Sequence, residues 1–299
     1  RGMGEAFQML EPDAVVVLGD RTEVLAAASS ATLLDIPIAH IHGGELTYGA
    51  YDDAIRHAVT KMSTWHFVAA KEYRKRVIQM GETPESVYNV GAVGLDNIER
   101  LYLYNRSEVE ARCGLELTRP SALVTFHPVT RGKVPSEVQM RAMLDAVNEI
   151  GDLKLIFTRC NNDPEGARLN AMLEIFVSEH GQRSVCHGSL GQQLYLSTMA
   201  QVDTVIGNSS SGLIEAPSFG VPTVNIGDRQ DGRLKAESII DCQPEKGEIE
   251  DAIRKALRIG RGCYSNPYGH PGASKRIVEV LAAELMKPRV VKLFHDLNF

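Results

Sequence analysis

The chain has 299 residues, of which 43% are hydrophobic and 23% charged, and its formal net charge at pH 7 is −6. This length and composition predict a globular protein with room for two domains and exclude a disordered chain. The negative balance provides no broad positive field for a nucleic-acid backbone, so we expect no nucleic-acid partner.

Cysteine usage and hydropathy narrow the class of protein further. The five cysteines stand singly, with no C-x-x-C pair, which argues against a disulfide framework and a zinc site. No apolar run reaches 18 residues, and the opening segment RGMGEAFQML lacks the order of a signal peptide. We therefore expect a cytoplasmic protein with no membrane partner.

Short apolar runs rich in β-branched residues alternate with helical patterns in the first part of the chain. Continuous apolar runs of this length are typical of parallel strands that are covered on both faces. They lie at 13–20, 36–44, 65–70 and 87–92. Between the first two, residues 21–35 have apolar residues at helical spacing.

A second series of the same kind follows residue 121. The predicted strands are 122–127, 153–159, 184–187, 203–206 and 222–226, and the predicted helices lie near 136–149, 165–180, 191–200 and 211–219. Strands that alternate with helices specify right-handed βαβ units and a parallel sheet.

Two such series predict an α/β protein with two Rossmann-like, doubly wound domains that face a cleft. We place the domains at 1–115 and 116–273, because a polar helix, a glycine and a proline interrupt the pattern between 112 and 120. We expect the C-terminal helix, 274–299, to pack back on the first domain. Ligands of such sheets bind at the carboxyl ends of the strands, so polar residues just after strands are the candidates for a site.

Two motifs of the first domain follow strands directly. LGDR (18–21) ends the first strand with Asp20 and Arg21, and a capping aspartate with a solvated arginine is the alternative. HIHGGE (40–45) places His42 and Glu45 at the end of the second strand, and its two glycines allow a backbone to approach a ligand closely.

The helix that begins near Tyr51 is predicted to have one apolar and one polar face. The apolar positions are 55, 58, 59 and 62, and the polar side chains are Asp52, Asp53, Arg56, His57 and Thr60. A solvated face with a carboxylate-rich first turn is the alternative. The adjacent HIHGGE motif favours a site.

The second domain has its polar motifs at strand ends as well. His127 in TFHPVT follows the first strand, where a structural role and a contact to a phosphate or carboxylate are both open. In GNSSSGLIE (207–215), Ser209, Ser210 and Ser211 precede a predicted helix that contains Glu215. Three serines exceed what a helix cap needs, so an anion site is the better interpretation, with Arg229 and Arg233 as sources of fixed charge.

These motifs, GDR, HIHGGELTYGAYDDAIRHAVTK, FHPVT, GNSSSGLIE and NIGDRQDGR, resemble in order and spacing the hydrolysing UDP-N-acetylglucosamine 2-epimerases of sialic acid and legionaminic acid biosynthesis. The resemblance covers nearly the whole chain. It implies the GT-B glycosyltransferase-like fold and the conversion of a UDP-sugar to a free 2-epimeric sugar, N-acetylmannosamine, plus UDP. It also implies an opening strand ahead of residue 1 and a homodimer or homotetramer.

Site residues carry over from the family position by position. The resemblance implies that Asp20, Glu45 and Asp52 are among the acid and base groups, and that Arg21, Arg56 and His57 lie near the sugar and the diphosphate. The implied nucleotide contacts are His127, Asn161, Ser209, Ser210, Glu215 and Arg229, with the serines on the diphosphate and Glu215 on the ribose hydroxyls. At His42 the sequence departs from the animal enzyme and the non-hydrolysing relatives, which have a glutamate there.

The chemistry of C2 epimerisation suggests roles for these groups. We expect UDP to leave from C1 by anti-elimination while a carboxylate takes the C2 proton, after which water adds to the glycal. Asp52 and Asp20 are the candidates for proton transfer at C2, and Glu45 or His42 for handling water. No metal-ligand cluster and no G-x-G-x-x-G motif after a strand are found, so we expect neither a metal nor a cofactor.

Several alternatives remain open from the sequence. The same reaction on UDP-2,4-diacetamido-trideoxy-glucose or a GDP-linked sugar, a non-hydrolysing epimerase and a GT-B glycosyltransferase would all use such a site. A nucleotide-sugar-binding regulatory module is the alternative from another class. The carboxylates at 20, 45 and 52 argue against it, because binding an anion gains nothing from nearby negative charge.

Overall fold

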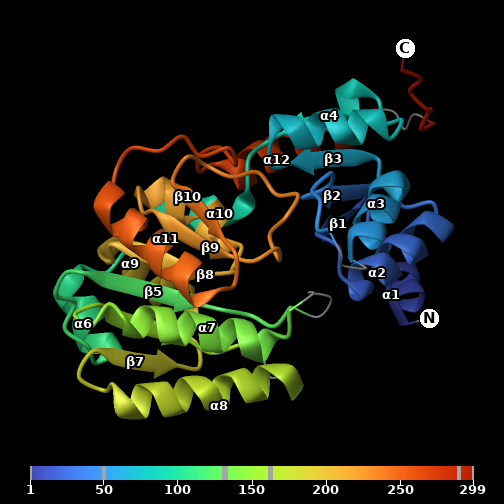
Figure 1. Ribbon diagram of the computed structural model, residues 1–299. Coiled ribbons are helices and arrows are strands. Elements are labelled where there is room, and N and C mark those ends of the chain that lie inside the picture. The colour runs from blue at the N-terminus through green and yellow to red at the C-terminus, as the bar shows by residue number, and fades with distance from the viewer. Residues whose placement is uncertain (1, 49–51, 130–133, 161–163, 288–290, 298–299) are drawn as a thin grey trace. The chain divides into compact units, whose positions relative to one another are not determined.

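The computed structural model describes residues 2–48, 52–129, 134–160, 164–287 and 291–297. The chain divides into two compact units, Arg1–Asp96 with Tyr268–Phe299, and Asn97–Pro267. Each unit is built on a parallel sheet, one of four strands and one of six (Figure 1). The predicted α/β class with two parallel sheets is confirmed.

The sheet of the first unit has its strands in chain order, β1-β2-β3-β4. These strands are β1 (Val15–Leu18), β2 (Ile38–Ile41), β3 (Trp65–Val68) and β4 (Val87–Asn89). The helices of this unit are α1 (Gly2–Leu10), α2 (Thr22–Leu33), α3 (Asp52–Met62), α4 (Lys71–Gln79), η1 (Pro84–Ser86), η2 (Val93–Leu95) and α12 (Ala273–Leu285). All three strand pairings are parallel, which confirms the four predicted strands.

Both faces of this sheet are covered. Ala28 of α2 and Val59 of α3 pack with Val17 and Ile38 on one face, while Ile277 of α12 packs with Phe67 on the other. Coverage on both faces explains why β2 and β3 are buried along nearly their whole length. Strand β1 differs, because only Val17 is buried while Val16 and Leu18 are exposed.

The second unit has the strand order β10-β9-β8-β5-β6-β7. Its strands are β5 (Ser121–Thr125), β6 (Lys154–Thr158), β7 (Ser184–His187), β8 (Thr204–Gly207), β9 (Thr223–Ile226) and β10 (Ile239–Cys242). Its helices are α6 (Arg106–Cys113), α7 (Ser136–Asn148), α8 (Pro164–Glu179), α9 (Gly191–Gln201), α10 (Ser211–Ile214), η3 (Ala216–Phe219) and α11 (Lys246–Ile259), and α5 (Asp96–Arg100) lies at the division between the units.

This order places a topological switch point in the second unit. From β5 the chain adds β6 and β7 on one side, whereas β8, β9 and β10 lie on the other. The connections after β5 and β8 therefore diverge to opposite faces of the sheet. In open α/β sheets the crevice at such a point is where ligands bind.

The division between the units differs from the boundary expected near 112–120. It falls between Asp96 and Asn97. The reason is packing, since Val109 and Cys113 of α6 lie in one buried cluster with Leu123 of β5 and Met199 of α9. The polar surface of α6 concealed this apolar contact in the sequence pattern.

Two further details differ from the sequence pattern. The helix expected at 211–219 is a single α-helical turn, α10, followed by the 3-10 helix η3 with Pro217 in its first turn. Strand β10 was not predicted, because Asp241 interrupts its short apolar run and only alternate residues are buried. Among the described residues, no helix is both long and apolar enough to span a bilayer.

Candidate active site

Arg56 organises the polar residues at the carboxyl ends of β1 and β2. Its side chain is only 4% exposed and is paired with the carboxylate of Asp20. It also donates to Thr47 Oγ1 at 3.0 Å and to the Glu45 carbonyl oxygen at 2.9 Å. The predicted polar face of α3 is thus partly buried, with Thr60 also inaccessible, and the alternative of a solvated face is wrong.

Asp53 completes this cluster, although the sequence reasoning did not include it among the site residues. Its Oδ1 accepts a hydrogen bond from the Thr47 backbone N–H at 2.8 Å and lies 3.5 Å from Arg56 Nη1. Its Oδ2 lies 3.4 Å from His57 Nε2. The sequence signal that could have identified Asp53 is its place beside Asp52 in the YDD segment.

His42 and Glu45 form a close pair on the loop after β2. His42 Nδ1 lies 2.5 Å from Glu45 Oε1, and Glu45 is buried. The His42 backbone N–H donates to the Phe67 carbonyl oxygen at 2.9 Å, and its φ of +65° is unusual for a residue other than glycine. A strained backbone at a polar pair is common at functional sites.

The two glycines of this loop approach the protein itself, which corrects the expectation that they approach a ligand. Gly44 has a φ of +77°, and a Cβ there would lie 2.6 Å from the Tyr73 carbonyl oxygen. A Cβ on Gly43 would lie 3.1 Å from both His40 Nδ1 and Thr60 Oγ1. Burial lowers the pKa of His40 to about 4, so this histidine is a neutral structural residue that also bonds the Gly19 carbonyl.

The remaining predicted residues of the first unit differ in placement. Burial, reinforced by the negative charge of Asp20, raises the pKa of Asp52. Burial lowers the pKa of His57, whose Nδ1 is buried without a hydrogen-bond partner among the described residues. Arg21 is not part of the Arg56 cluster, since its side chain is 79% exposed and bonds Glu23 at 2.8 Å.

In the second unit the site residues gather at the switch point between β5 and β8. Asn208 holds both backbone groups of His127, accepting from its N–H at 2.7 Å and donating to its carbonyl at 2.8 Å. This junction requires Gly207, because a Cβ there would lie 1.9 Å from the Thr125 carbonyl oxygen at a φ of +133°. The loops that carry His127 and the serines are thereby fixed side by side.

The three serines do not act as an ordinary helix cap. Ser210 occupies the N-cap position of α10 and makes no side-chain capping bond. Ser209 Oγ lies 3.0 Å from Ser211 Oγ, which lies 2.6 Å from the Tyr195 hydroxyl. The capping alternative therefore does not explain the run of serines.

Cationic and acidic groups flank these serines. Arg229 donates to the Asn208 carbonyl oxygen at 3.0 Å, and Gln230 donates to the same oxygen at 2.7 Å. Burial and then the positive charge of Arg233 lower the pKa of Arg229. Burial raises the pKa of Glu215 to about 7 despite the opposing effects of its backbone hydrogen bond and Arg233.

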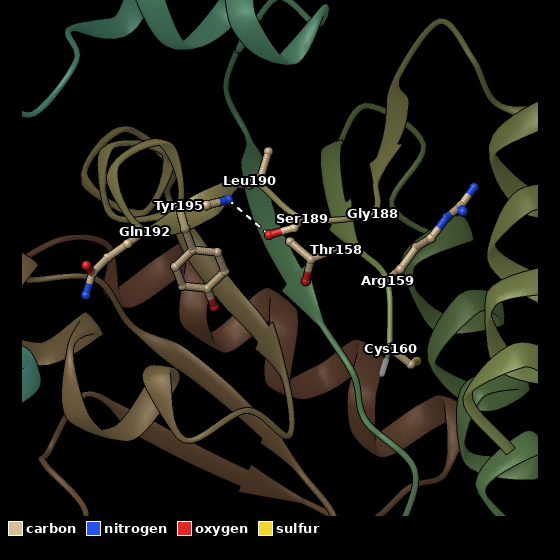
Figure 2. Close-up of a pocket in the computed structure, with 9 residues that line it drawn as sticks. Thr158, Arg159, Cys160, Gly188, Ser189, Leu190, Gln192 and Tyr195 are labelled. Carbon is tan, nitrogen blue, oxygen red and sulfur yellow. Dashed lines mark hydrogen bonds between the residues drawn. The ribbon is translucent and has the colours of Figure 1, made fainter. Parts of the chain in front are cut away.

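A pocket of about 680 Å³ opens beside this cluster, over the carboxyl ends of β6 and β7. It is lined by Thr158, Arg159, Cys160, Gly188, Ser189, Leu190, Gly191, Gln192 and Tyr195. Figure 2 shows Tyr195 on the wall formed by α9, while Arg159 points away, toward α8, where it pairs with Glu174. Sequence reasoning missed this pocket because, apart from Arg159, its lining residues are uncharged and form no recognisable motif.

The predicted residues thus fall into two groups, one in each unit. Asp20, His42, Glu45, Asp52, Arg56 and His57 lie at the carboxyl ends of β1 and β2 and on α3, and His127, Ser209, Ser210, Ser211, Glu215 and Arg229 lie around the switch point. Asn161 lies outside the described residues. No group of three or more histidine, cysteine, aspartate or glutamate side chains suited to a metal ion occurs in the described ranges.

The chain is similar to known proteins over most of its length. The chain is 39% identical over 251 residues, or 84% of its length, to a GDP/UDP-N,N'-diacetylbacillosamine 2-epimerase (hydrolyzing) of Campylobacter jejuni, of whose length it spans 65%. It is 38% identical to the polysialic acid biosynthesis protein P7 of Escherichia coli, covering 98% of this chain and 76% of that protein.

A solved structure shares the fold. The UDP-GlcNAc 2-epimerase of Neisseria meningitidis bound to UDP-GlcNAc matches with a TM-score of 0.78 at 20% identity, covering 94% of this chain and 79% of that one. The profile of the family described as UDP-N-acetylglucosamine 2-epimerase matches residues 1–282. The chain therefore belongs to the UDP-N-acetylglucosamine 2-epimerase family.

Proposed function

We propose that the protein is a hydrolysing nucleotide-sugar 2-epimerase that converts UDP-N-acetylglucosamine to N-acetylmannosamine and UDP. The observation that carries this proposal is the cluster around Arg56, where Asp20, Asp53 and the loop of Glu45 are held together at strand ends. A site that only bound an anionic ligand would gain nothing from these carboxylates.

The first unit supplies the acid and base groups in this proposal. Asp52 is the base for the C2 proton, because burial and the charge of Asp20 raise its pKa and so its proton affinity. The pairing with Arg56 holds the Asp20 carboxylate in place, where it faces the developing positive charge on the sugar ring. The close pair of His42 and Glu45 passes protons to and from water, which gives His42 a role in place of the glutamate of other family members.

The second unit binds the UDP portion. Ser209, Ser210 and Ser211 bind the diphosphate, and Arg229 balances its charge. The positive charge of Arg233 acts on Arg229 and supports this, because an anion bound beside them would offset that charge. Glu215 accepts from the ribose hydroxyls, with an Oε2 that is buried and has no hydrogen-bond partner among the described residues. The neighbouring pocket takes the nucleoside.

The reaction then runs in two stages. In the first, the C1–O bond to UDP breaks as Asp52 removes the C2 proton, which leaves a glycal and UDP. In the second, water adds its oxygen at C1, and a proton is delivered to C2 from the opposite face. Negative charge that develops on the leaving diphosphate is stabilised at the serines and Arg229.

The same reaction on a diacetamido sugar is a second candidate. The Campylobacter jejuni relative, at 39% identity, is named for N,N'-diacetylbacillosamine linked to GDP or UDP. The similarity supports a substrate whose sugar has a second acetamido group at C4. The nucleotide of such a substrate would be either GDP or UDP.

The decisive experiment follows the C2 hydrogen. The protein is incubated with UDP-N-acetylglucosamine in deuterated water, and the products are followed by proton NMR. We expect free N-acetylmannosamine with deuterium at C2, together with UDP. Glu45→Gln is expected to slow the reaction by about 10²-fold or more while UDP still binds, and Glu72→Gln, on the exposed side of α4, is the matched control.

Other outcomes would redirect the assignment. A UDP-linked epimer would identify a non-hydrolysing enzyme. Reaction only with UDP- or GDP-linked diacetamido sugar would favour the second candidate. Bound UDP without C2 exchange on any of these sugars would indicate a transferase or a binding module and would contradict the proposal.

A further inference from the structure

Five hydroxyl groups form a continuous chain through the second unit. Thr158 Oγ1 lies 2.7 Å from Thr125 Oγ1, which lies 3.4 Å from the Tyr195 hydroxyl. Tyr195 lies 2.6 Å from Ser211 Oγ, and Ser211 Oγ lies 3.0 Å from Ser209 Oγ. The chain runs from the buried ends of β5 and β6 to the serine loop, with Tyr195 at its centre.

Each hydroxyl has one proton to donate, so the donor of every bond in the chain is set once one hydroxyl gives its proton to a group outside the chain. At its outer end, Ser209 Oγ also lies within 3.4 Å of the Ser211 backbone N–H, which can only donate. That N–H takes one of the two acceptor sites of Ser209 Oγ. When an acceptor outside the chain takes the Ser209 proton, Ser211, Tyr195, Thr125 and Thr158 each donate to the next hydroxyl toward Ser209.

We propose that Tyr195 is a positioning residue that orders the hydroxyls of Ser211 and Ser209 so that Ser209 donates to the diphosphate of the bound nucleotide. This inference rests on the proposed function, since it assigns the serines to the diphosphate. An anion accepts and never donates, so its arrival selects the outward direction along the whole chain. Successive hydrogen bonds that point the same way polarise and strengthen one another.

The position requires a phenol and not merely an aromatic ring. Phenylalanine would fill the same wall of the pocket but would break the chain between Thr125 and Ser211. Burial raises the pKa of Tyr195, so its proton is retained and available at neutral pH. Ser211 would then be free to turn its proton toward other acceptors, at the expense of the order at Ser209.

The test is calorimetric titration of UDP and of uridine into Tyr195→Phe, Ser211→Ala and the double variant. Tyr264→Phe is the matched control, because it removes one hydroxyl, which donates to the Gly260 carbonyl oxygen, from the same unit. We expect Tyr195→Phe to weaken UDP binding by about five- to tenfold and uridine binding by less than about twofold. The double variant is expected to bind UDP no more weakly than Ser211→Ala alone.

The outcomes separate this inference from the proposed function. If wild type binds UDP and Tyr195→Phe binds it equally well, or loses UDP and uridine affinity alike, Tyr195 is only a wall of the pocket and the inference is wrong. The inference would also be wrong if the losses of UDP affinity caused by Tyr195→Phe and Ser211→Ala added up in the double variant. If wild type binds neither UDP nor uridine, the proposed nucleotide site fails and the inference with it.

Discussion

The buried guanidinium of Arg56 and the partly buried carboxylate of Asp20 form an ion pair between residues 36 positions apart. One partner lies on α3 and the other directly follows β1. The same guanidinium holds Thr47 and the Glu45 carbonyl, so the pair fixes two loops as well as two charges.

We expect Arg56→Lys to lower both stability and activity. Lysine keeps the charge but cannot reach Asp20, Thr47 and the Glu45 carbonyl together. The expected loss is about 2–4 kcal/mol in the free energy of unfolding, together with loss of turnover. Urea unfolding and an assay of UDP release measure the two effects. Arg168→Lys, on a side chain that is 76% exposed, should change neither; if the two variants behave alike, the role given to Arg56 is wrong.

Glu215 is expected to release a proton when UDP binds near pH 7. Burial raises its pKa to about 7, and donation from ribose hydroxyls would favour the ionised form and lower that pKa. UDP affinity should therefore rise between pH 6 and pH 8. Titration calorimetry in two buffers of different ionisation enthalpy measures the proton release.

Glu215→Gln is the control for protons that the phosphate groups of UDP itself take up or release on binding. The difference between wild type and this variant isolates the carboxyl group. A raised pKa in the folded state also means that its contribution to stability is present below about pH 4.5 and is lost as the pH rises through about 7. Glu215→Gln should thus unfold at a higher temperature than wild type at pH 8. Equal proton release by both proteins would count against the ribose contact.

Glu82 is expected to stabilise the first unit at neutral pH. It is 1% exposed and is bonded by Lys61 at 2.5 Å, Lys292 at 2.8 Å and His66 at 3.0 Å. Burial alone would raise its pKa, but these three donors together lower it to about 2. The stabilisation is therefore present above the unfolded-state pKa of about 4.5 and is lost as the pH falls toward about 2.

The measurement is urea unfolding of Glu82→Gln at several pH values. We expect a loss of about 3 kcal/mol at pH 7 that shrinks steadily below pH 4.5. Glu72→Gln, at an exposed position, serves as the control. A loss that stays constant down to pH 2.5 would show that Glu82 acts by shape and not by charge.

Gly207→Ala is expected to disrupt the junction of β5 and β8. The methyl group of an alanine would collide with the Thr125 carbonyl oxygen, and the alanine backbone would have to adopt a φ of +133°. The expected loss is about 3 kcal/mol or more in the free energy of unfolding, with loss of UDP binding because the serine loop shifts. Thermal unfolding checks this against Gly151→Ala, where an added Cβ meets no atom within 4 Å. Similar melting temperatures for both variants would contradict the prediction.

Periodicity was enough to predict most of the fold. Short apolar runs separated by helical spacing located nine of the ten strands found among the described residues, because consecutive apolar residues are a local signature of a strand in a parallel sheet. It did not reveal β10, whose burial alternates, or the division at Asp96, which depends on the buried face of α6.

The candidate site, like the fold, was predictable where the signal is local in the sequence. The sequence alone determined which residues are polar at strand ends, because motifs such as HIHGGE and NSSSG are local. Only the tertiary structure decided that Arg56 pairs with Asp20 while Arg21 turns to solvent, and that Tyr195 meets Ser211. Contacts between distant segments depend on strand order and on where each loop leaves its strand, and these are consequences of packing the whole chain.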